Sequence, residues 1–158
     1  MPTVAMKDAC DLLDADHIAV KHLFVEYARL AMAAPAAVAE RQPIAARICA
    51  ELTVHAQIEE EIFYPALREA IASPGLLDRA EAEHQQAKEL IAQIQAAKRA
   101  TPALDDLVSE LARAVELHVK EERDDLFPKA RSTPGLDLEA LGARLQERQQ
   151  ELQAAVRR

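Results

Sequence analysis

The chain has 158 residues and a net charge of −8, and half of its residues are apolar although only 3% are aromatic. This length suits one domain with its own core. Acidic and basic residues are interspersed, which excludes the basic stripe of a nucleic-acid surface. No stretch is apolar for long enough to span a bilayer or to form an N-terminal signal region, so we expect a cytoplasmic protein that binds neither nucleic acid nor membrane.

Strong helix formers dominate the sequence, and proline and glycine divide it into five segments. The expected helices cover residues 8–34, 44–72, 76–100, 103–131 and 137 to the C-terminus. Asp14 and Asp16 are the candidate N-caps of the first helix, Pro35 ends it, and Pro43 opens the second. The short connections predict an all-α fold, an antiparallel up-down-up-down four-helix bundle with an additional C-terminal helix.

Residues 1–158 are expected to form a single domain, with the bundle core at about 8–131 and the last helix at about 136–157. Leucines recur near helical spacing in that last segment, at Leu138, Leu141, Leu145 and Leu152. We expect this apolar face to pack on the bundle. The alternative is a dimer face, which would make the protein a homodimer.

A short pattern occurs twice in the chain. His55 and Glu59 are four residues apart, as are His118 and Glu122, and each glutamate is followed six residues later by proline. The second copy lies 63 positions after the first, which predicts two equivalent helices related by approximate two-fold symmetry. Each proline should kink its helix about two turns beyond the glutamate and leave the region of the glutamate regular.

The spacing within each pair suits a metal site. Residues four apart on a helix differ by about 400° in direction, so their side chains share one face. Imidazole and carboxylate together suit iron, zinc or manganese. In antiparallel helices, residues equally distant from the turn lie level, and this test places six residues at one depth: His17, His55, Glu59, His84, His118 and Glu122. His22 lies roughly 140° from His17 and should face solvent.

Four histidines and two carboxylates buried together would be very costly without a metal. Six protein ligands exceed the four of a structural zinc site, so we expect two metal ions. The symmetric arrangement places His17 and His55 on one ion, His84 and His118 on the other, and Glu59 and Glu122 as bridges. An oxo or hydroxo bridge would complete a pair whose ions are about 3.5–4 Å apart.

With these motifs the sequence resembles the hemerythrin-like, or HHE cation-binding, family over nearly its whole length. The resemblance is carried by Leu12-Leu13-x-x-Asp16-His17, His55-x-x-x-Glu59-Glu60 with Phe63-Tyr64-Pro65, Glu83-His84, and His118-x-x-x-Glu122 with Leu126-Phe127-Pro128. It implies a four-helix bundle around a carboxylate- and oxo-bridged di-iron centre. Family members bind dioxygen reversibly, sense oxygen or iron, or act on peroxide or nitric oxide.

The chain departs from the oxygen-carrying hemerythrins in two places. Those proteins have two histidines four apart on the third helix, where this chain has His84 and Lys88, and they end with a His and an Asp five apart instead of His118 and Glu122. The centre should therefore be more symmetric and open at both ions, which favours redox turnover of peroxide over reversible dioxygen carriage.

Three further residues are candidates for a role near the metals. Lys88 shares the face of His84, and it would either pair with an acidic neighbour or stabilise a bound oxidant. Tyr27 and Tyr64 are candidate phenol donors or ligands, although neither lies on the ligand face of a regular helix. Phe24, Ile62, Ile91 and Leu126 are expected to line an apolar pocket.

The predicted function is that of a non-haem di-iron protein reacting with a small oxidant, with peroxide turnover in oxidative-stress defence preferred and a di-iron catalase- or peroxidase-like activity left open. The alternative is a module that binds dioxygen or nitric oxide reversibly, senses it, or handles iron, without turnover. Its predicted partner apart from iron is a small diatomic or peroxide molecule, and a second copy of the chain is the partner if the last helix forms a dimer face.

Overall fold

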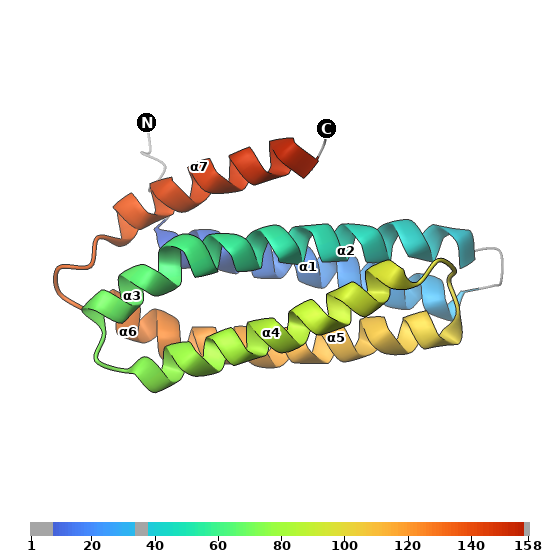
Figure 1. The fold of residues 1–158 in the computed structure, drawn as a ribbon, viewed down its shortest axis with the longest axis horizontal. Coiled ribbons are helices and arrows are strands. Elements are labelled where there is room, and N and C mark those ends of the chain that lie inside the picture. The colour runs from blue at the N-terminus through green and yellow to red at the C-terminus, as the bar shows by residue number, and fades with distance from the viewer. Residues whose placement is uncertain (1–7, 34–37, 157–158) are drawn as a thin grey trace, which may run out of the picture.

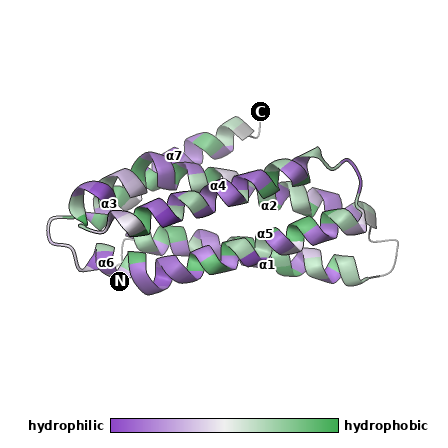
Figure 2. Cartoon of the chain, turned by 60° about the horizontal axis from the view of Figure 1, so that its bottom comes forward, coloured by the Kyte–Doolittle hydropathy of each residue, from purple (hydrophilic) through white to green (hydrophobic). Residues whose placement is uncertain are grey.

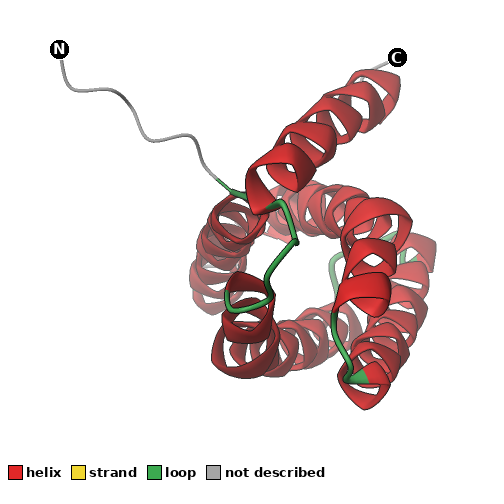
Figure 3. Cartoon of the chain, turned by 90° about the vertical axis from the view of Figure 1, so that its left-hand side faces the viewer, coloured by secondary structure: helices red, strands yellow, loops and turns green. Residues whose placement is uncertain are grey.

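The computed structural model describes residues 8–33 and 38–156. The helical elements are α1 (Ala9–Met32), α2 (Val38–Ile58), η2 (Glu59–Phe63), α3 (Tyr64–Ala70), α4 (Pro74–Ala96), α5 (Pro102–Glu121), η3 (Glu122–Leu126), α6 (Phe127–Arg131) and α7 (Leu138–Val156). These elements form four long antiparallel rods, which are α1, α2 with η2 and α3, α4, and α5 with η3 and α6. The rods enclose a common interior, and α7 lies outside them (Figures 1 and 3). The predicted all-α bundle with an additional C-terminal helix is confirmed.

The rods pack unequally around the bundle. The closest neighbours are α1 with α2 and α4 with α5, whereas α2 with α4 and α1 with α5 meet less extensively. Helix α7 contacts α1, α2 and η2 along the outside of the bundle (Figure 1). A cavity can therefore open at the two looser interfaces, between α2 and α4 and between α1 and α5.

Helix α1 is capped by Asp8, not by Asp14 or Asp16. The Asp8 carboxylate accepts from the Asp11 amide at 2.8 Å, and the Asp11 carboxylate accepts from the Asp8 amide at 3.3 Å, which forms a capping box. Asp14 and Asp16 lie inside the helix, where their carboxylates are free to contact side chains of the interior. Pro35 lies outside the described residues.

Helix α2 begins at Val38, six residues earlier than the sequence predicts, so Pro43 lies inside the helix. The proline removes one backbone donor close to the helix start. Two side chains hold the turn that precedes it, since Arg41 donates to Asp105 at 2.9 Å and Gln42 donates to the Ala97 carbonyl at 3.1 Å. These tertiary contacts offset the lost backbone bond. Helix α4 in turn ends at Ala96, four residues before the expected end.

The expectation that the region of each glutamate stays regular is wrong, because both copies of the repeat pass through one π-helical turn. This turn begins at Glu59 in η2 and at Glu122 in η3. The Tyr64 amide donates to the Glu59 carbonyl, five residues back. Proline at 65 has no amide to donate, and in a regular helix its ring would crowd the carbonyl four residues earlier. The wider turn avoids that contact and lets α3 begin with proline in its first turn.

The apolar core has two clusters, one on each side of a polar layer. One cluster lies at the end of the bundle that carries α3, α6 and α7, with Leu13, Phe63, Leu67, Phe127 and Leu145 among its buried members. The other fills the opposite half of the bundle and includes Val20, Leu23, Ile48, Leu104 and Leu111. The polar layer lies between them, at the level of residue 17 on α1.

Helix α7 belongs to the first cluster. Leu141 and Leu145 are buried, and Leu138 and Leu152 are partly buried against the same cluster. The expectation that the last helix packs on the bundle is confirmed, because these leucines pack against the core of the same chain. Gly135, with φ of 84°, lies in the turn that leads into α7.

Hydrophilic residues recur along every labelled helix (Figure 2). Accordingly, no helix among the described residues combines the length and the hydropathy needed to cross a membrane.

Candidate metal centre

The six residues predicted to share one depth meet in the polar layer. They come from all four rods, and the structure buries each of them: His17, His55, Glu59, His84, His118 and Glu122. Their exposed fractions run from 0% for Glu59 to 8% for His118. The i, i+4 spacing and the positions of the turns therefore predict the convergence correctly.

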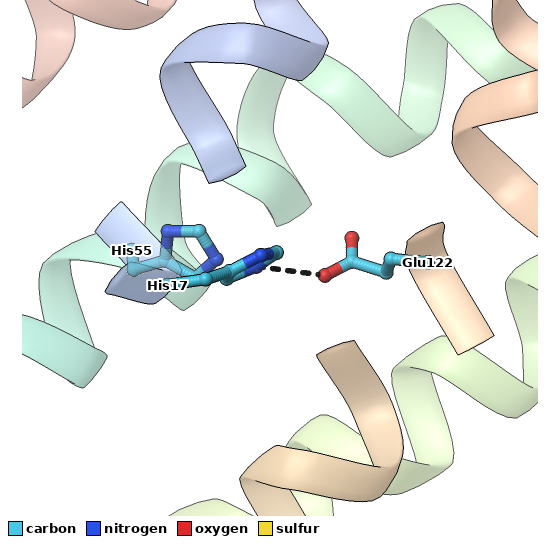
Figure 4. Close-up of side chains that lie close together, drawn as sticks. All are labelled: His17, His55 and Glu122. Atoms are coloured by element: carbon cyan, nitrogen blue, oxygen red, sulfur yellow. Dashed lines mark ion pairs between the residues drawn. The ribbon is translucent and has the colours of Figure 1, made fainter. Parts of the chain in front are cut away.

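The six side chains divide into two triads. One holds His17, His55 and Glu122, and the other holds Glu59, His84 and His118, with one ligand atom from each residue within 4.8 Å of the others. Figure 4 shows the first triad, in which Glu122 faces His17 across the interior while His55 lies beside His17. These are the two groups of histidines that the sequence assigns to separate ions.

Each carboxylate also reaches the other triad. Oε1 of Glu122 lies 3.1 Å from Nε2 of His17 and 3.2 Å from Nε2 of His118. Oε1 of Glu59 lies 3.1 Å from Nε2 of His55 and 3.2 Å from Nε2 of His84. Each glutamate therefore contacts one histidine of each triad, which is the placement that a bridging ligand requires.

Four of these atoms lack a hydrogen-bond partner among the described residues: His17 Nε2, His55 Nε2, Glu59 Oε1 and Glu122 Oε1. The short distances between them do not have hydrogen-bond geometry. Leaving a buried polar atom unpaired costs about 1–3 kcal/mol. Lone pairs that converge in this way suit a cation, so the donor set fits the metal pair implied by the sequence.

The other ring nitrogen of each of the four buried histidines faces a carboxylate. The Nδ1 atoms lie 3.2 Å from Asp14 for His17, 3.0 Å from Asp16 for His55, 3.0 Å from Glu60 for His84, and 2.8 Å from Glu83 for His118. Such a partner fixes the ring and directs Nε2 toward a metal. Sequence reasoning did not assign these four roles, although three of the acids adjoin a predicted ligand in the sequence and Asp14 lies three residues before His17.

Pairing and burial set the protonation of the cluster. Burial alone would lower the pKa of His118, but Glu122 and Glu83 raise this pKa to about 10. Burial likewise opposes the shift at His55, where Glu59 and Asp16 hold the pKa well above its ordinary value. The pKa of Glu59 is well below its usual range because the histidines outweigh its burial. Metal binding must therefore displace protons from this cluster.

Tyr64 enters the cluster because of the π-helical turn. In a regular helix it would point roughly 140° away from Glu59, but the wider turn brings residues five apart onto one face. Its hydroxyl lies 3.1 Å from His84 Nε2 and 3.2 Å from His118 Nε2, and it donates to Glu59 Oε2 at 3.2 Å. Burial, followed by the two carboxylates, raises the pKa of Tyr64 well above its ordinary value.

The corresponding position of the second copy is Phe127. Its ring stacks on His17 with centroids 6.1 Å apart and offers no oxygen. One triad therefore adjoins a phenol and the other an apolar ring. The two halves are less alike than the repeated sequence predicts.

Lys88 pairs with an acidic neighbour, which is one of its two expected roles. Its ammonium group donates to Glu60 at 2.6 Å, and the side chain is 48% exposed. Because Glu60 also contacts His84, the lysine acts on the cluster through that carboxylate.

The structure corrects the expectation of a near-site role for Tyr27. Its hydroxyl donates to Asp105 at 2.7 Å within the second core cluster, and it contacts none of the six residues. Burial and Asp105 raise the pKa of Tyr27, so it remains a protonated donor there. His22 is exposed on α1, as predicted.

A cavity of about 440 Å³ leads from the surface between α2 and α4 to all four histidines. Its walls are largely apolar and include Val20, Leu52, Ala87, Ile91 and Val115, while Lys88 and Glu60 also line it. Ile91 therefore lines the pocket as expected. Phe24 lines a second cavity, of about 520 Å³, between α1 and α5, whereas Ile62 and Leu126 belong to the first core cluster.

Antiparallel helices with histidines and glutamates at one level define a class of helical-bundle proteins that bind metal cations in their interior. The model of one such family, described as hemerythrin HHE cation binding domain, matches residues 8–130. The chain therefore belongs to the hemerythrin HHE cation-binding family, as the sequence motifs indicate. The match includes the four rods and all six candidate ligands and ends before α7.

A solved structure from the same family is similar to this one. It is the crystal structure of a hemerythrin HHE cation binding domain-containing protein from Mycobacterium kansasii, a homologue of Rv2633c. The two chains are 26% identical, with a TM-score of 0.76 over 95% of this chain and 90% of the other. The likeness supports both the fold and the family.

A protein of Nostoc sp. described as a DNA nickase is 35% identical to this chain over 86 residues. The match covers 54% of this chain but 24% of the Nostoc protein, so this chain spans about a quarter of that relative. That description is of the Nostoc protein, and the likeness concerns one segment of it.

Proposed function

We propose that this chain is a non-haem di-iron protein that turns over hydrogen peroxide. The observation that carries the proposal is the pair of triads joined by two shared carboxylates. His17 and His55 would hold one ion, His84 and His118 the other, and Glu59 and Glu122 would bridge them. Mixed imidazole and carboxylate ligands of this kind suit iron.

When bound, the iron pair would supply two electrons to one peroxide and recover them from the next, so that two H₂O₂ give two H₂O and one O₂. Side chains of this protein would hold and transfer the protons that this reaction requires. Tyr64 carries a proton on its hydroxyl between the carboxylates of Glu59 and Glu122, at 3.2 and 3.4 Å. In the metal-free protein its raised pKa keeps that proton in place at neutral pH, and the position of the hydroxyl would let it donate the proton to a departing oxygen.

The cavity between α2 and α4 supports access for a small molecule. Its apolar walls limit the water that reaches the histidines, and its volume of about 440 Å³ easily admits a peroxide. The Lys88–Glu60 pair lines the same cavity and supplies polar groups on the route inward.

A direct test uses iron-loaded protein that has been reduced without oxygen and then mixed separately with peroxide and with dioxygen. Turnover predicts one O₂ released for every two peroxides, measured with an oxygen electrode while the visible spectrum is followed. The exposed His22→Ala variant should behave like the wild type. A centre that binds iron but releases no oxygen from peroxide would overturn the proposed activity.

The apolar walls of the cavity favour a second candidate, the reversible binding of dioxygen or nitric oxide for delivery or sensing. An iron-handling role would likewise involve binding without turnover. In the same experiment, this candidate predicts a stable spectrum with dioxygen that disappears when the gas is removed.

A further inference from the structure

The carboxylates that face the histidines have partners of their own, and these partners differ in charge. Asp14 accepts from Arg123 at 2.6 Å, and Glu60 accepts from Lys88 at 2.6 Å. Glu83 neighbours Glu121, which lies 3.8 Å from Arg79. Asp14 and Glu60 therefore pair directly with a cation, whereas Glu83 is linked to one only through Glu121.

The fourth pair, His55 with Asp16, has a neutral partner that comes from α7. The Gln149 amide nitrogen lies 3.0 Å from both carboxylate oxygens of Asp16, and one of these oxygens lies 3.0 Å from His55 Nδ1. Gln149 lies beyond residues 8–130, the part that matches the family model. Through Asp16, Gln149 therefore links α7, which lies outside the matched domain, to the candidate ligand His55.

The neighbouring residue attaches α7 to the segment that carries Glu59. Arg148 donates to the Glu61 carboxylate at 2.8 and 3.3 Å, and Glu61 lies in η2. Leu141 and Leu145 bury the preceding turns of α7 in the core. Gln149 is thus held in place by a packed helix, and its contact with Asp16 is partly shielded from water, since the Asp16 side chain is 22% exposed.

We infer that Gln149 is a positioning residue for the metal centre. It fixes the Asp16 carboxylate, which orients the His55 ring and directs Nε2 toward the ion that His17 shares. Because the amide carries no charge, it leaves the Asp16 charge directed at His55, and with metal bound His55 becomes a stronger electron donor than a histidine whose carboxylate pairs with a lysine or arginine. Helix α7 therefore helps to set both the retention of metal and the reduction potential of the centre.

This inference depends on the metal-holding part of the proposed function and not on peroxide turnover. The test compares Gln149→Met, which keeps the length of the side chain but removes the donor, with Gln150→Met at the exposed neighbouring position. Loss of a carboxylate that directly orients a ligating histidine costs about 10–100-fold in metal affinity or activity, and Gln149→Met frees the Asp16 carboxylate from its place. We expect a chelator to extract iron at least tenfold faster from Gln149→Met than from the wild type or Gln150→Met.

Two further measurements separate positioning from a general structural effect. The unfolding temperature of the metal-free protein should be nearly the same in all three proteins. Gln149→Lys restores a donor and adds a charge, so it should retain iron like the wild type while raising the midpoint potential. The inference would be overturned if iron were extracted from Gln149→Met at the wild-type rate. It would also be overturned if Gln149→Met lost iron faster and its metal-free form unfolded at a clearly lower temperature than the wild type. Wild-type protein that holds two ions without peroxide turnover would overturn only the proposed activity.

Discussion

At the scale of single residues, Tyr64 and Phe127 make the two halves of the centre different. They occupy equivalent positions after Glu59 and Glu122, yet only Tyr64 brings a hydroxyl within 3.1–3.2 Å of the His84 and His118 ring nitrogens. The Phe127 ring packs on His17 instead. Proton transfer should therefore occur at the His84–His118 half.

Tyr64→Phe tests this role. Positioned proton transfer contributes about 10²–10⁴-fold to a rate, so we expect kcat for peroxide to fall at least tenfold while both ions stay bound. Steady-state oxygen evolution and metal analysis measure these two quantities.

Tyr27→Phe is the matched control for that variant. It removes a hydrogen bond to Asp105 outside the cluster and should lower the free energy of unfolding by about 1–2 kcal/mol without changing kcat. Wild-type turnover in Tyr64→Phe would rule out the phenol as the proton donor.

At the scale of elements, much of the centre is predictable from the sequence. The i, i+4 pairs and the distances to the turns depend only on helical geometry and on short connections, and both hold in the structure. The π-helical turns are not predictable from spacing, because helical periodicity assumes a regular helix up to each proline. That assumption also kept Tyr64 away from the ligand face. The contacts of Asp14 and Asp16 with the histidines are not predictable from spacing, because acidic residues at such positions are equally typical of helix caps.

The π-helical turns lead to a prediction for the prolines. Pro65→Ala restores a backbone donor, which favours a regular helix and rotates Tyr64 away from Glu59. We expect its peroxide turnover to fall toward that of Tyr64→Phe, as measured by oxygen evolution.

Pro128→Ala is the matched change in the second copy of the repeat. It affects the turn before Phe127, which carries no hydroxyl, so its turnover should fall less than that of Pro65→Ala. Equal turnover in wild type and Pro65→Ala would show that the proline does not hold Tyr64 in the cluster.

At the scale of the whole molecule, the polar layer separates two apolar clusters and links all four rods. Buried unpaired atoms in that layer destabilise the metal-free protein, whereas bound metal would join the rods. Free metal at a thousandfold excess over its Kd adds about 4 kcal/mol to the free energy of unfolding.

For a chain of this size, that gain corresponds to a rise of roughly 10 °C in Tm. Calorimetry of the loaded and metal-free protein should show this rise, and Glu59→Ala should abolish most of it. Equal unfolding temperatures with and without metal would contradict a structural role for the ions.

The most direct test of the di-iron proposal is the metal content of protein loaded with ferrous iron in the absence of oxygen. We predict two iron ions per chain in the wild type. Because each carboxylate contacts both triads, Glu59→Ala and Glu122→Ala should each lose both ions together. One zinc ion per chain with no iron, or a variant that cleanly keeps one ion, would contradict the shared-carboxylate centre.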